Sequence, residues 1–516
     1  MKYSFLVIIL TAVIVYSCGN NSGQSEQNGK IKPNIIIIYA DDLGYGDVSA
    51  YGDGIIKTPN IDKLVNGGIK FTKGYASSST CTPSRYALLT GTYPWRNKRA
   101  HILPGSAPLI IDTAQLTIPK MLKEMGYHTA VIGKWHLGLG SGNVDWNKHI
   151  SPGPNEIGFD YSYIMAATQD RVPTVFIDNG NVENLDPDDP IEVSYKHKFP
   201  GEQTGREHPE LLKMMYSHGH DGTIVNGISR IGHMTGGKKA CWVDEDMSDR
   251  FLAKAQEFIR THKNEYFFLY YGLQQPHVPR TPNPRFVGKS GLGPRGDAII
   301  EEDWNVGQIL ITLEEEGLLE NTLIIFSSDN GPVLDDGYKD KAVELNNGHK
   351  PWGPFRGGKY SLYEAGTRMP FVTYWKGRIK PGVSDAMVSQ IDILNSLAAL
   401  TGSSERSDDG ENLMDVFIGK SNNGREAMVF EATGRTGYRK DDWVMIPPYN
   451  GAAVNKLVNI ELGNSKEYQL YNIKKDPGQK VNLAKKNREK LKEMIKEFES
   501  IRGTNAGKGI KKLELK

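Results

Sequence analysis

The chain of 516 residues has few cysteines, no long apolar run and almost no net charge. Three cysteines are too few for a disulfide framework, and we expect no disulfide. The 62 basic and 61 acidic residues form no charge block, which argues against nucleic acid or an anionic membrane surface as a partner. There is no Asp-x-Asp-x-Asp-Gly calcium loop, no zinc pattern and no internal repeat. What remains is an ordinary globular protein, long enough for one large α/β domain and a smaller one.

The longest apolar segment near the start of the chain runs from Phe5 to Val15, after a basic N-terminus. About 11 such residues are too few for a membrane-spanning helix and predict a secretory signal, here residues 1–17. The sequence ending at Cys18 resembles a bacterial lipoprotein cleavage site, although Tyr16 is bulkier than usual there. Cleavage and release without a lipid is the alternative. Residues 18–31, rich in Asn, Ser, Gln and Gly, predict a flexible tether. We therefore expect an exported protein of the periplasm or cell surface, held at the membrane only by a lipid on Cys18.

Three short runs of β-branched and aromatic residues predict strands: Asn34–Tyr39, Tyr266–Gly272 and Asn321–Ser328. Because the runs are continuously apolar, each strand should be buried on both faces, as in a mainly parallel sheet. Polar pairs follow two of them, Asp41-Asp42 after the first and Asp329-Asn330 after the last. Open α/β sheets place ligands at the carboxyl ends of their strands, whereas either pair alone is more often turn chemistry.

The segment Ser79–Gly91 predicts a helix, with Thr82 as N-cap, Pro83 in the first helical position and a glycine as the stop. Cys81 then lies at the helix N-terminus, where free backbone N–H groups and the dipole favour an anion. Arg85 adds a positive charge one turn further on. From the residues alone, Cys81 is either a thiolate with a lowered pKa or a small buried hydrophobic residue.

The string Cys81-Thr82-Pro83-Ser84-Arg85, followed by Leu-Thr-Gly after three further residues, resembles the signature of the type I sulfatases. In that family a separate maturation enzyme oxidises the cysteine to formylglycine, whose hydrated aldehyde is the nucleophile. The resemblance covers roughly residues 32–400 and then weakens. It implies an alkaline-phosphatase-like α/β fold, with a large mixed sheet sandwiched by helices and a smaller C-terminal antiparallel sheet plus a helix.

The resemblance also implies a metal cluster made by Asp41, Asp42, Asp329, Asn330 and the hydroxyl of formylglycine at Cys81. Three carboxylates and an amide form an all-oxygen set, which suits Ca²⁺ better than Zn²⁺. Mg²⁺ suits it less well, because this ion tends to keep several waters. The expected cofactor is therefore Ca²⁺.

Lys134 and His136 are two residues apart, so on an extended backbone both side chains leave the same face and can meet one substrate. Alone, such a pair is more often solvent-facing, but Gly-Lys-Trp-His-Leu-Gly is also a family string. The resemblance places His277 at the ester oxygen and Lys359 in a second lysine motif. It implies that Arg85 and Lys134 neutralise developing charge. It further implies that His277 and Lys359 assist the leaving oxygen and that His136 takes a proton from the second hydroxyl of the hydrate.

The sugar is read by a variable region of such enzymes, which here includes Asp170–Pro173 and Gly227–Trp242. We take three residues as candidate substrate contacts: Arg171, His218 and His220. Each of them alone is more often structural. Tyr360 stands where the family more often has glycine, which could narrow the pocket, and Cys241 is expected in the core.

The chain is predicted to divide into a catalytic domain, residues 32–401, and a C-terminal subdomain, residues 425–516. Met387–Leu400, with apolar residues at helical spacing, predicts the last helix of the catalytic domain. The subdomain is predicted to contain three strands and a final helix: Ala427–Glu431, Trp443–Ile446, Ala452–Ile460, and about Asn487 to Ile501.

The sequence thus predicts a hydrolase that removes sulfate from carbohydrate esters through formylglycine made from Cys81. Algal polysaccharides such as ulvan or carrageenan are the expected substrates, with host glycosaminoglycan as another source. A phosphoesterase of the alkaline-phosphatase superfamily is one alternative, but it would normally need several zinc-binding histidines, and that set is missing. A non-enzymatic glycan-binding surface lipoprotein with an unmodified Cys81 is the other.

Overall fold

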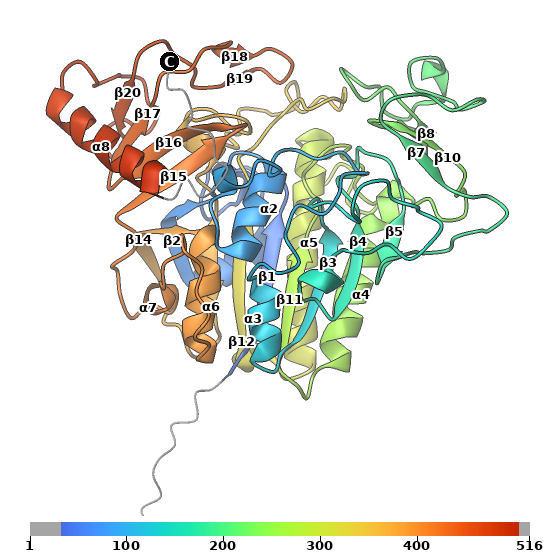
Figure 1. Cartoon of the computed structure of the whole chain (residues 1–516), viewed down its shortest axis with the longest axis horizontal. Coiled ribbons are helices and arrows are strands. Elements are labelled where there is room, and N and C mark those ends of the chain that lie inside the picture. Colours follow the sequence, from blue (N-terminus) through green and yellow to red (C-terminus); the bar gives the residue numbers. More distant parts are fainter. Residues whose placement is uncertain (1–31, 505–516) are drawn as a thin grey trace, which may run out of the picture. The chain divides into compact units, whose positions relative to one another are not determined.

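The computed structural model describes residues 32–504; the expected signal (1–17), Cys18 and the tether (18–31) lie outside this range. A ten-stranded mixed sheet forms its centre (Figure 1). In spatial order its strands are β14 (Gly382–Ser389), β2 (Ile69–Tyr75), β13 (Phe371–Tyr374), β12 (Thr322–Ser328), β1 (Asn34–Ala40), β11 (Phe267–Gly272), β3 (His128–Lys134), β4 (Tyr161–Met165), β5 (Phe176–Asp178) and β6 (Asn181–Val182).

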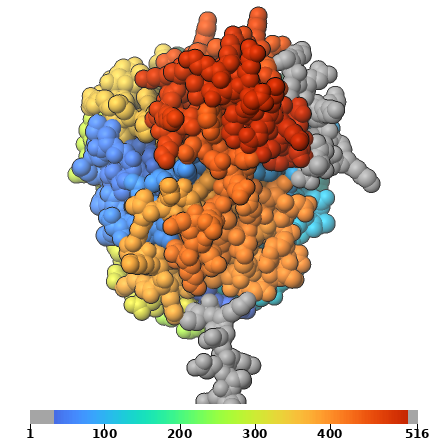
Figure 2. Space-filling model, turned by 90° about the vertical axis from the view of Figure 1, so that its left-hand side faces the viewer, coloured from blue at the N-terminus to red at the C-terminus, as the bar shows by residue number. Residues whose placement is uncertain are grey.

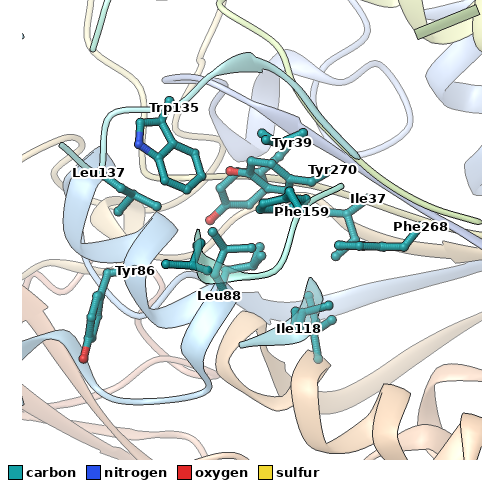
Figure 3. Packing of buried hydrophobic residues seen from close by; sticks show 14 of the residues in the cluster. Ile37, Tyr39, Tyr86, Leu88, Ile118, Trp135, Leu137, Phe159, Phe268 and Tyr270 are labelled. Carbon is teal, nitrogen blue, oxygen red and sulfur yellow. The ribbon is translucent and has the colours of Figure 1, made fainter. Parts of the chain in front are cut away.

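Strand β1 is the centre of the sheet and is buried along its whole length, as its apolar sequence predicts. It pairs in parallel with β11 and β12, so that Ile37 lies between Tyr270 and Ile325. Because side chains alternate along a strand, Ile37 and Tyr39 face one layer of helices and Ile38 faces the other. Figure 3 shows the first of these faces, where Ile37 and Tyr39 lie among residues of α2, α3 and neighbouring strands.

Helices cover both faces of the sheet. Their bounds are α1 (Pro59–Gly67), α2 (Cys81–Thr90), α3 (Ile118–Glu124), α4 (Met247–Thr261), α5 (Gly293–Glu315), α6 (Ile393–Thr401), α7 (Met414–Phe417) and α8 (Arg488–Thr504). Helices α2, α3 and α6 contact one another in one layer, and α5 contacts both α1 and α4 in the other. No helix among residues 32–504 is long and apolar enough to cross a bilayer.

Four neighbouring parallel strands, β12, β1, β11 and β3, end at the same edge of the sheet. Asp329 follows β12, Asp41 follows β1, and Lys134 is the last residue of β3. The loop after β11 carries His277. The strand order therefore brings together side chains that are almost 300 residues apart in the sequence.

A smaller antiparallel sheet follows, as expected. It consists of β15 (Ala427–Ala432), β16 (Arg435–Lys440), β17 (Trp443–Ile446) and β20 (Gln469–Asn472). Helix α8 packs on β16 and β17. Figure 2 shows the C-terminal residues (red) as one continuous mass of atoms on one side of the molecule. The Glu431 N–H donates a hydrogen bond to the Ser77 carbonyl, and the Glu431 carbonyl accepts one from the Ser79 N–H. These two bonds connect the smaller sheet to the segment just before α2. The division into residues 32–401 and 425–516 stays a prediction.

The helix expected over Met387–Leu400 is present but begins later, and one expected strand is wrong. Residues 387–389 end strand β14, and the helix begins only at Ile393, because the Asp392 carboxylate accepts a hydrogen bond from the Ser389 N–H and turns the chain there. The expected strand Ala452–Ile460 is instead a separate hairpin of β18 (Val454–Asn455) and β19 (Ile460–Glu461). The polar, positive-φ residue Asn459 lies between its strands.

Two more small two-stranded sheets lie in the variable region. One pairs β7 (Glu192–Ser194) with β10 (His233–Thr235), which are far apart in the sequence, and the other is a hairpin of β8 (Ile224–Val225) and β9 (Ile228–Ser229). Figure 1 shows them (green) beyond β4 and β5, away from the C-terminal sheet. The region predicted to read the sugar is therefore built from short strand pairs and loops rather than from the large sheet.

Candidate active site

Helix α2 starts two residues earlier than predicted. Thr80 is its N-cap and Cys81 its first residue, while the hydroxyl of Thr82 donates to the backbone carbonyl of His136 at 2.9 Å instead of capping the helix. The predicted stop is confirmed, because Gly91 has a left-handed backbone with φ 62°. Cys81 therefore occupies the first turn, beside the free N–H groups of the helix.

The Cys81 side chain is almost fully buried, with 2% of its surface exposed. Burial raises the pKa of its thiol above the usual value, although the charges of Lys134 and Lys359 work to lower it. The interpretation of Cys81 as a thiolate with a lowered pKa is therefore not supported. Cys81 and Cys241 are both free thiols, and Cys241 accepts a hydrogen bond from the Thr174 hydroxyl at 3.5 Å.

The four polar residues that follow β1 and β12 meet in one buried cluster. The Asp42 N–H donates to Asp329 Oδ1 at 3.2 Å, and the Asn330 amide donates to Asp42 Oδ1 at 2.7 Å. Asp41 Oδ1 and Asn330 Oδ1 are buried without a hydrogen-bond partner. Ligand atoms of Asp41, Asp42 and His277 also lie within 4.8 Å of one another. Buried oxygens without a partner are costly, so this set of carboxylate and amide oxygens fits a hard divalent cation.

Two lysines neutralise this cluster from opposite sides. Lys134 Nζ lies 2.6 Å from Asp41 Oδ2, and Lys359 Nζ lies 2.8 Å from both Asp42 Oδ2 and Asp336 Oδ2. Burial raises the pKa of Asp41 well above its usual value, and Lys134 opposes this. Burial works to lower the pKa of Lys359, but Asp336 and Asp42 hold it well above its usual value, so this ammonium is charged.

Arg85 is completely buried and does not line the cavity described below. Its Nε and Nη2 donate to Asp329 Oδ2 at 3.0 and 2.8 Å, and its Nη1 donates to the Lys134 carbonyl and to the Tyr270 hydroxyl at 3.2 Å each. The guanidinium is therefore committed to protein groups. Arg85 therefore holds Asp329 in place and has no donor directed at a substrate in the cavity.

His136 does not lie on an extended backbone, because strand β3 ends at Lys134 and His136 has φ 54°. The spacing argument that placed the two side chains on one face is wrong. His136 Nε2 lies 2.9 Å from the Leu103 carbonyl, which assigns the ring proton to Nε2, and Nδ1 is buried without a partner. Burial lowers the pKa of His136 well below its usual value, with Lys134 adding to the effect. The result is a neutral imidazole with a free lone pair.

His277 faces the acidic cluster. Its Nδ1 lies 2.7 Å from the Val278 carbonyl, and its Nε2 lies 3.8 Å from Asp42 Oδ2. Burial and the charge of Lys359 lower its pKa well below the usual value, while Asp170 acts in the opposite direction. Its Nε2 is therefore the atom that can exchange a proton at the cluster.

A cavity of about 340 Å³ opens above the cluster. It is lined by Cys81, Ile102, Asp170, Arg171, His218, Gly219, His220, Ile231, His277, Asp336, Lys359, Tyr360, Asn455, Leu457 and Val458. Three predicted catalytic residues and all three predicted substrate contacts thus share one cavity. Lys134, His136 and Arg85 lie behind its wall.

The substrate side of this cavity is organised by Asp170. Its carboxylate lies 2.9 Å from both Arg171 Nη1 and His220 Nε2. Burial works to raise the pKa of Asp170, but the charge of Arg171 and the hydrogen bond to His220 hold it well below its usual value. His220 is fixed further by the His218 carbonyl at 2.7 Å. The cavity thus presents an ordered cationic group to an anionic substrate.

Sequence reasoning missed Asp336 and the cavity wall at Asn455–Val458. Asp336 accepts hydrogen bonds from Lys359 at 2.8 Å and from the Tyr360 hydroxyl at 3.1 Å. Tyr360 has φ 72°, a conformation that glycine adopts without strain, which explains why the family more often has glycine at this position. Its ring lines the cavity, as its size suggested. The only sequence signal for Asp336 was its place a few residues after β12.

A family model described as Sulfatase matches residues 33–403, which is more than half of the chain. The chain therefore belongs to the sulfatase family, and it is a sulfuric ester hydrolase. The large mixed sheet between helices and the smaller C-terminal sheet confirm the expected alkaline-phosphatase-like fold class.

Individual relatives agree with this assignment. An N-acetylgalactosamine-6-O-sulfatase of Bacteroides thetaiotaomicron is 51% identical over 509 residues, which cover 97% of this chain and 100% of the relative. Human arylsulfatase A is 30% identical over 472 residues, covering 87% and 83%. A structure described in the context of glycosaminoglycan metabolism by B. thetaiotaomicron superposes with a TM-score of 0.90 at 51% identity, covering 92% of this chain and 100% of that one.

Replacing Arg85 by methionine should destabilise the protein, because it leaves Asp329 buried without its main partner. Breaking a buried pair in this way typically costs about 3–5 kcal/mol in the free energy of unfolding. The matched control is Arg285→Met, which removes an exposed Arg–Asp pair worth about 1 kcal/mol or less. Urea denaturation of both variants and the wild type gives the comparison. Equal, small losses would show that Arg85 does not hold Asp329.

Proposed function

We propose that the chain hydrolyses the 6-sulfate ester of N-acetylgalactosamine in glycosaminoglycan fragments, using formylglycine made from Cys81 and a bound Ca²⁺. The observation that carries this proposal is the position of Cys81 at the start of α2, in one cavity with His277 and Lys359 and next to the acidic cluster. The sugar is taken from the relative that is 51% identical along its whole length. We prefer this sugar to the algal polysaccharides for that reason.

The cation would be held by Asp41, Asp42, Asp329 and Asn330, whose unpartnered oxygens fit it. It would supply positive charge for the sulfate oxygens. Formylglycine at position 81, formed by a separate maturation enzyme, would supply a nucleophilic hydroxyl and a second hydroxyl through which sulfate is later released. The N–H groups of the first turn of α2 provide further positive potential at this point.

The chain's own residues would move the protons. His136 Nδ1, neutral and without a partner, can accept a proton behind residue 81. The negative charge of a bound sulfate would raise the lowered pKa of His277, so that its Nε2 could take up a proton and deliver it to the leaving sugar oxygen, and Lys359 would place a fixed positive charge beside it. Lys134 pairs with Asp41 and opposes the rise in its pKa that burial causes, and Arg85 would keep Asp329 in place. Arg171, His218 and His220 would contact the sugar.

We also propose that the chain is exported to the periplasm or cell surface and carries a lipid on Cys18. The apolar segment before Cys18 and the polar tether after it support this. Such an anchor would hold the enzyme where glycan fragments arrive, with no membrane-spanning helix among residues 32–504.

Purified protein from a host with the maturation enzyme should desulfate N-acetylgalactosamine 6-sulfate. Its kcat/KM should be at least tenfold lower on N-acetylgalactosamine 4-sulfate or N-acetylglucosamine 6-sulfate. Polar groups of the pocket that hydrogen-bond to one sugar would have no partner when another sugar is bound. Sulfate release measured on all three sugars gives the comparison. Cys81→Ala should be inactive, and mass spectrometry should find the Cys81 thiol converted in the active wild type. An alkylatable Cys81 in fully active protein would refute the formylglycine mechanism.

Metal binding can be followed without turnover. Ca²⁺ at 100 times its Kd should stabilise chelator-treated protein by about 2.7 kcal/mol, because the ion binds only the folded state. Asp41→Asn should lose most of this gain, while the exposed control Asp188→Asn keeps it. Thermal unfolding with and without Ca²⁺ measures the difference. Stabilisation and reactivation by Zn²⁺ but not by Ca²⁺ would contradict the proposed cofactor.

The role of His277 depends on how easily the alcohol leaves. A sugar alkoxide needs a proton at the bridging oxygen, whereas nitrophenolate leaves nearly unaided. His277→Ala should therefore lose about 10² to 10⁴ in kcat on the sugar sulfate and far less on nitrophenyl sulfate. His136→Ala should impair both substrates, and the exposed control His208→Ala neither. Equal losses of the His277 variant on the two substrates would transfer the role to Lys359.

A further inference from the structure

A second and larger cavity, of about 670 Å³, lies outside the site described so far. It is lined by Pro332, Val333, Leu334, Val343, Asn346, Pro351, Trp352, Pro354, Phe355, Arg356, Gly357, Val458, Asn459, Ile460, Glu461, Gly478 and Lys480. Neither the acidic cluster nor any proposed catalytic residue takes part in it. Its volume is within the range of cavities that bind small organic ligands.

The second cavity adjoins the catalytic cavity. Three chain segments run from one to the other: 332–336, 356–360 and 455–461. In each segment only a few residues separate the two linings, and four extended residues span at most about 14 Å. Val458 lines both cavities. A short oligosaccharide can therefore have one sugar in the catalytic cavity and the next sugars in the second.

The lining of the second cavity suits a sugar with a negative charge. Trp352 is half-buried and brings an aromatic ring to this lining, which also includes Asn346 and Asn459. Arg356 is already held by Glu461 at 2.7 Å. Lys480 is exposed, and its ammonium group has no ion-pair or hydrogen-bond partner among residues 32–504. This lysine is thus available to a carboxylate on a bound ligand.

We propose that the second cavity binds the acidic sugar joined to the sulfated residue, so that the enzyme prefers oligosaccharides to the sulfated monosaccharide. Trp352 stacks on this sugar and Lys480 pairs with its carboxylate. The inference rests on the proposed function, because in glycosaminoglycans an amino sugar is joined to an acidic one. It adds a binding site whose residues take no part in the sulfate chemistry.

The test compares kcat/KM on N-acetylgalactosamine 6-sulfate with kcat/KM on a tetrasaccharide that alternates this sugar with an acidic sugar. The wild type should prefer the tetrasaccharide by at least tenfold. Trp352→Ala should lower the preference by about 2- to 12-fold, the usual range for an aromatic contact. Its matched control is Trp304→Ala, a half-buried tryptophan outside both cavities.

Charge is tested separately with Lys480→Glu and the exposed control Lys475→Glu from the same segment. Lys480→Glu should lose activity on the tetrasaccharide but keep it on the monosaccharide. The loss should disappear on a tetrasaccharide whose carboxylates are reduced to alcohols. An equal loss on both tetrasaccharides would overturn the ion pair and with it the choice of an acidic sugar.

Binding of the desulfated tetrasaccharide, measured by calorimetry, tests the second cavity independently of turnover. Weaker binding by Trp352→Ala than by Trp304→Ala would support the second cavity as a binding site. This conclusion would hold even if no sulfate were released from the monosaccharide, because the lack of release would count only against the proposed function. Normal hydrolysis of the monosaccharide, no preference for the tetrasaccharide and unchanged binding by Trp352→Ala would overturn the inference and leave the proposed function standing.

Discussion

The site depends on a balance of charges in a buried space. Asp41, Asp42 and Asp329 lie together in the protein interior, where ionised carboxylates repel one another and burial disfavours their charged form. Three buried cations oppose them: Arg85, Lys134 and Lys359. The anions come from the ends of β1 and β12, and the cations come from α2, β3 and the loop before β13. Moving any strand by one residue would turn its charged side chain to the other face and leave a charge unpaired.

The parts of this arrangement that follow from local pattern were predictable. Continuous apolar runs identified β1, β11 and β12, and the polar pairs after two of them identified the acidic edge. His136 was different, because its left-handed backbone is fixed by contacts with Thr82 and Leu103, which are distant in sequence. The hairpin at 454–461 was missed as well, since two-residue strands carry no periodicity and it is held by long-range bonds such as Leu362 N–H to the Leu462 carbonyl.

Tyr360, which stands where the family more often has glycine, has a strained backbone and a side chain that contacts the site. A tyrosine in a left-handed conformation is strained by roughly 1–2 kcal/mol relative to glycine. Arg435 donates to its carbonyl at 2.9 Å and Ser79 accepts from its N–H at 2.9 Å, which together hold the strained backbone. Its hydroxyl then reaches Asp336, the second partner of Lys359. The residue that narrows the cavity thus also hydrogen-bonds to the carboxylate that pairs with Lys359.

Part of the wall around the substrate lies beyond the stretch of the chain that carries the proposed chemistry and the other proposed sugar contacts. Every proposed catalytic and metal-binding residue, from Asp41 to Lys359, falls inside residues 33–403, where the family model matches. The wall formed by Asn455, Leu457 and Val458, and Lys480 in the second cavity, fall beyond it. This wall is held beside the loop that carries Lys359, because the Ser361 hydroxyl and the Leu362 N–H donate to the carbonyls of Glu461 and Leu462 at the end of the hairpin. A sulfatase can therefore change the glycan it accepts by altering the C-terminal hairpin while the buried charges that perform hydrolysis stay as they are.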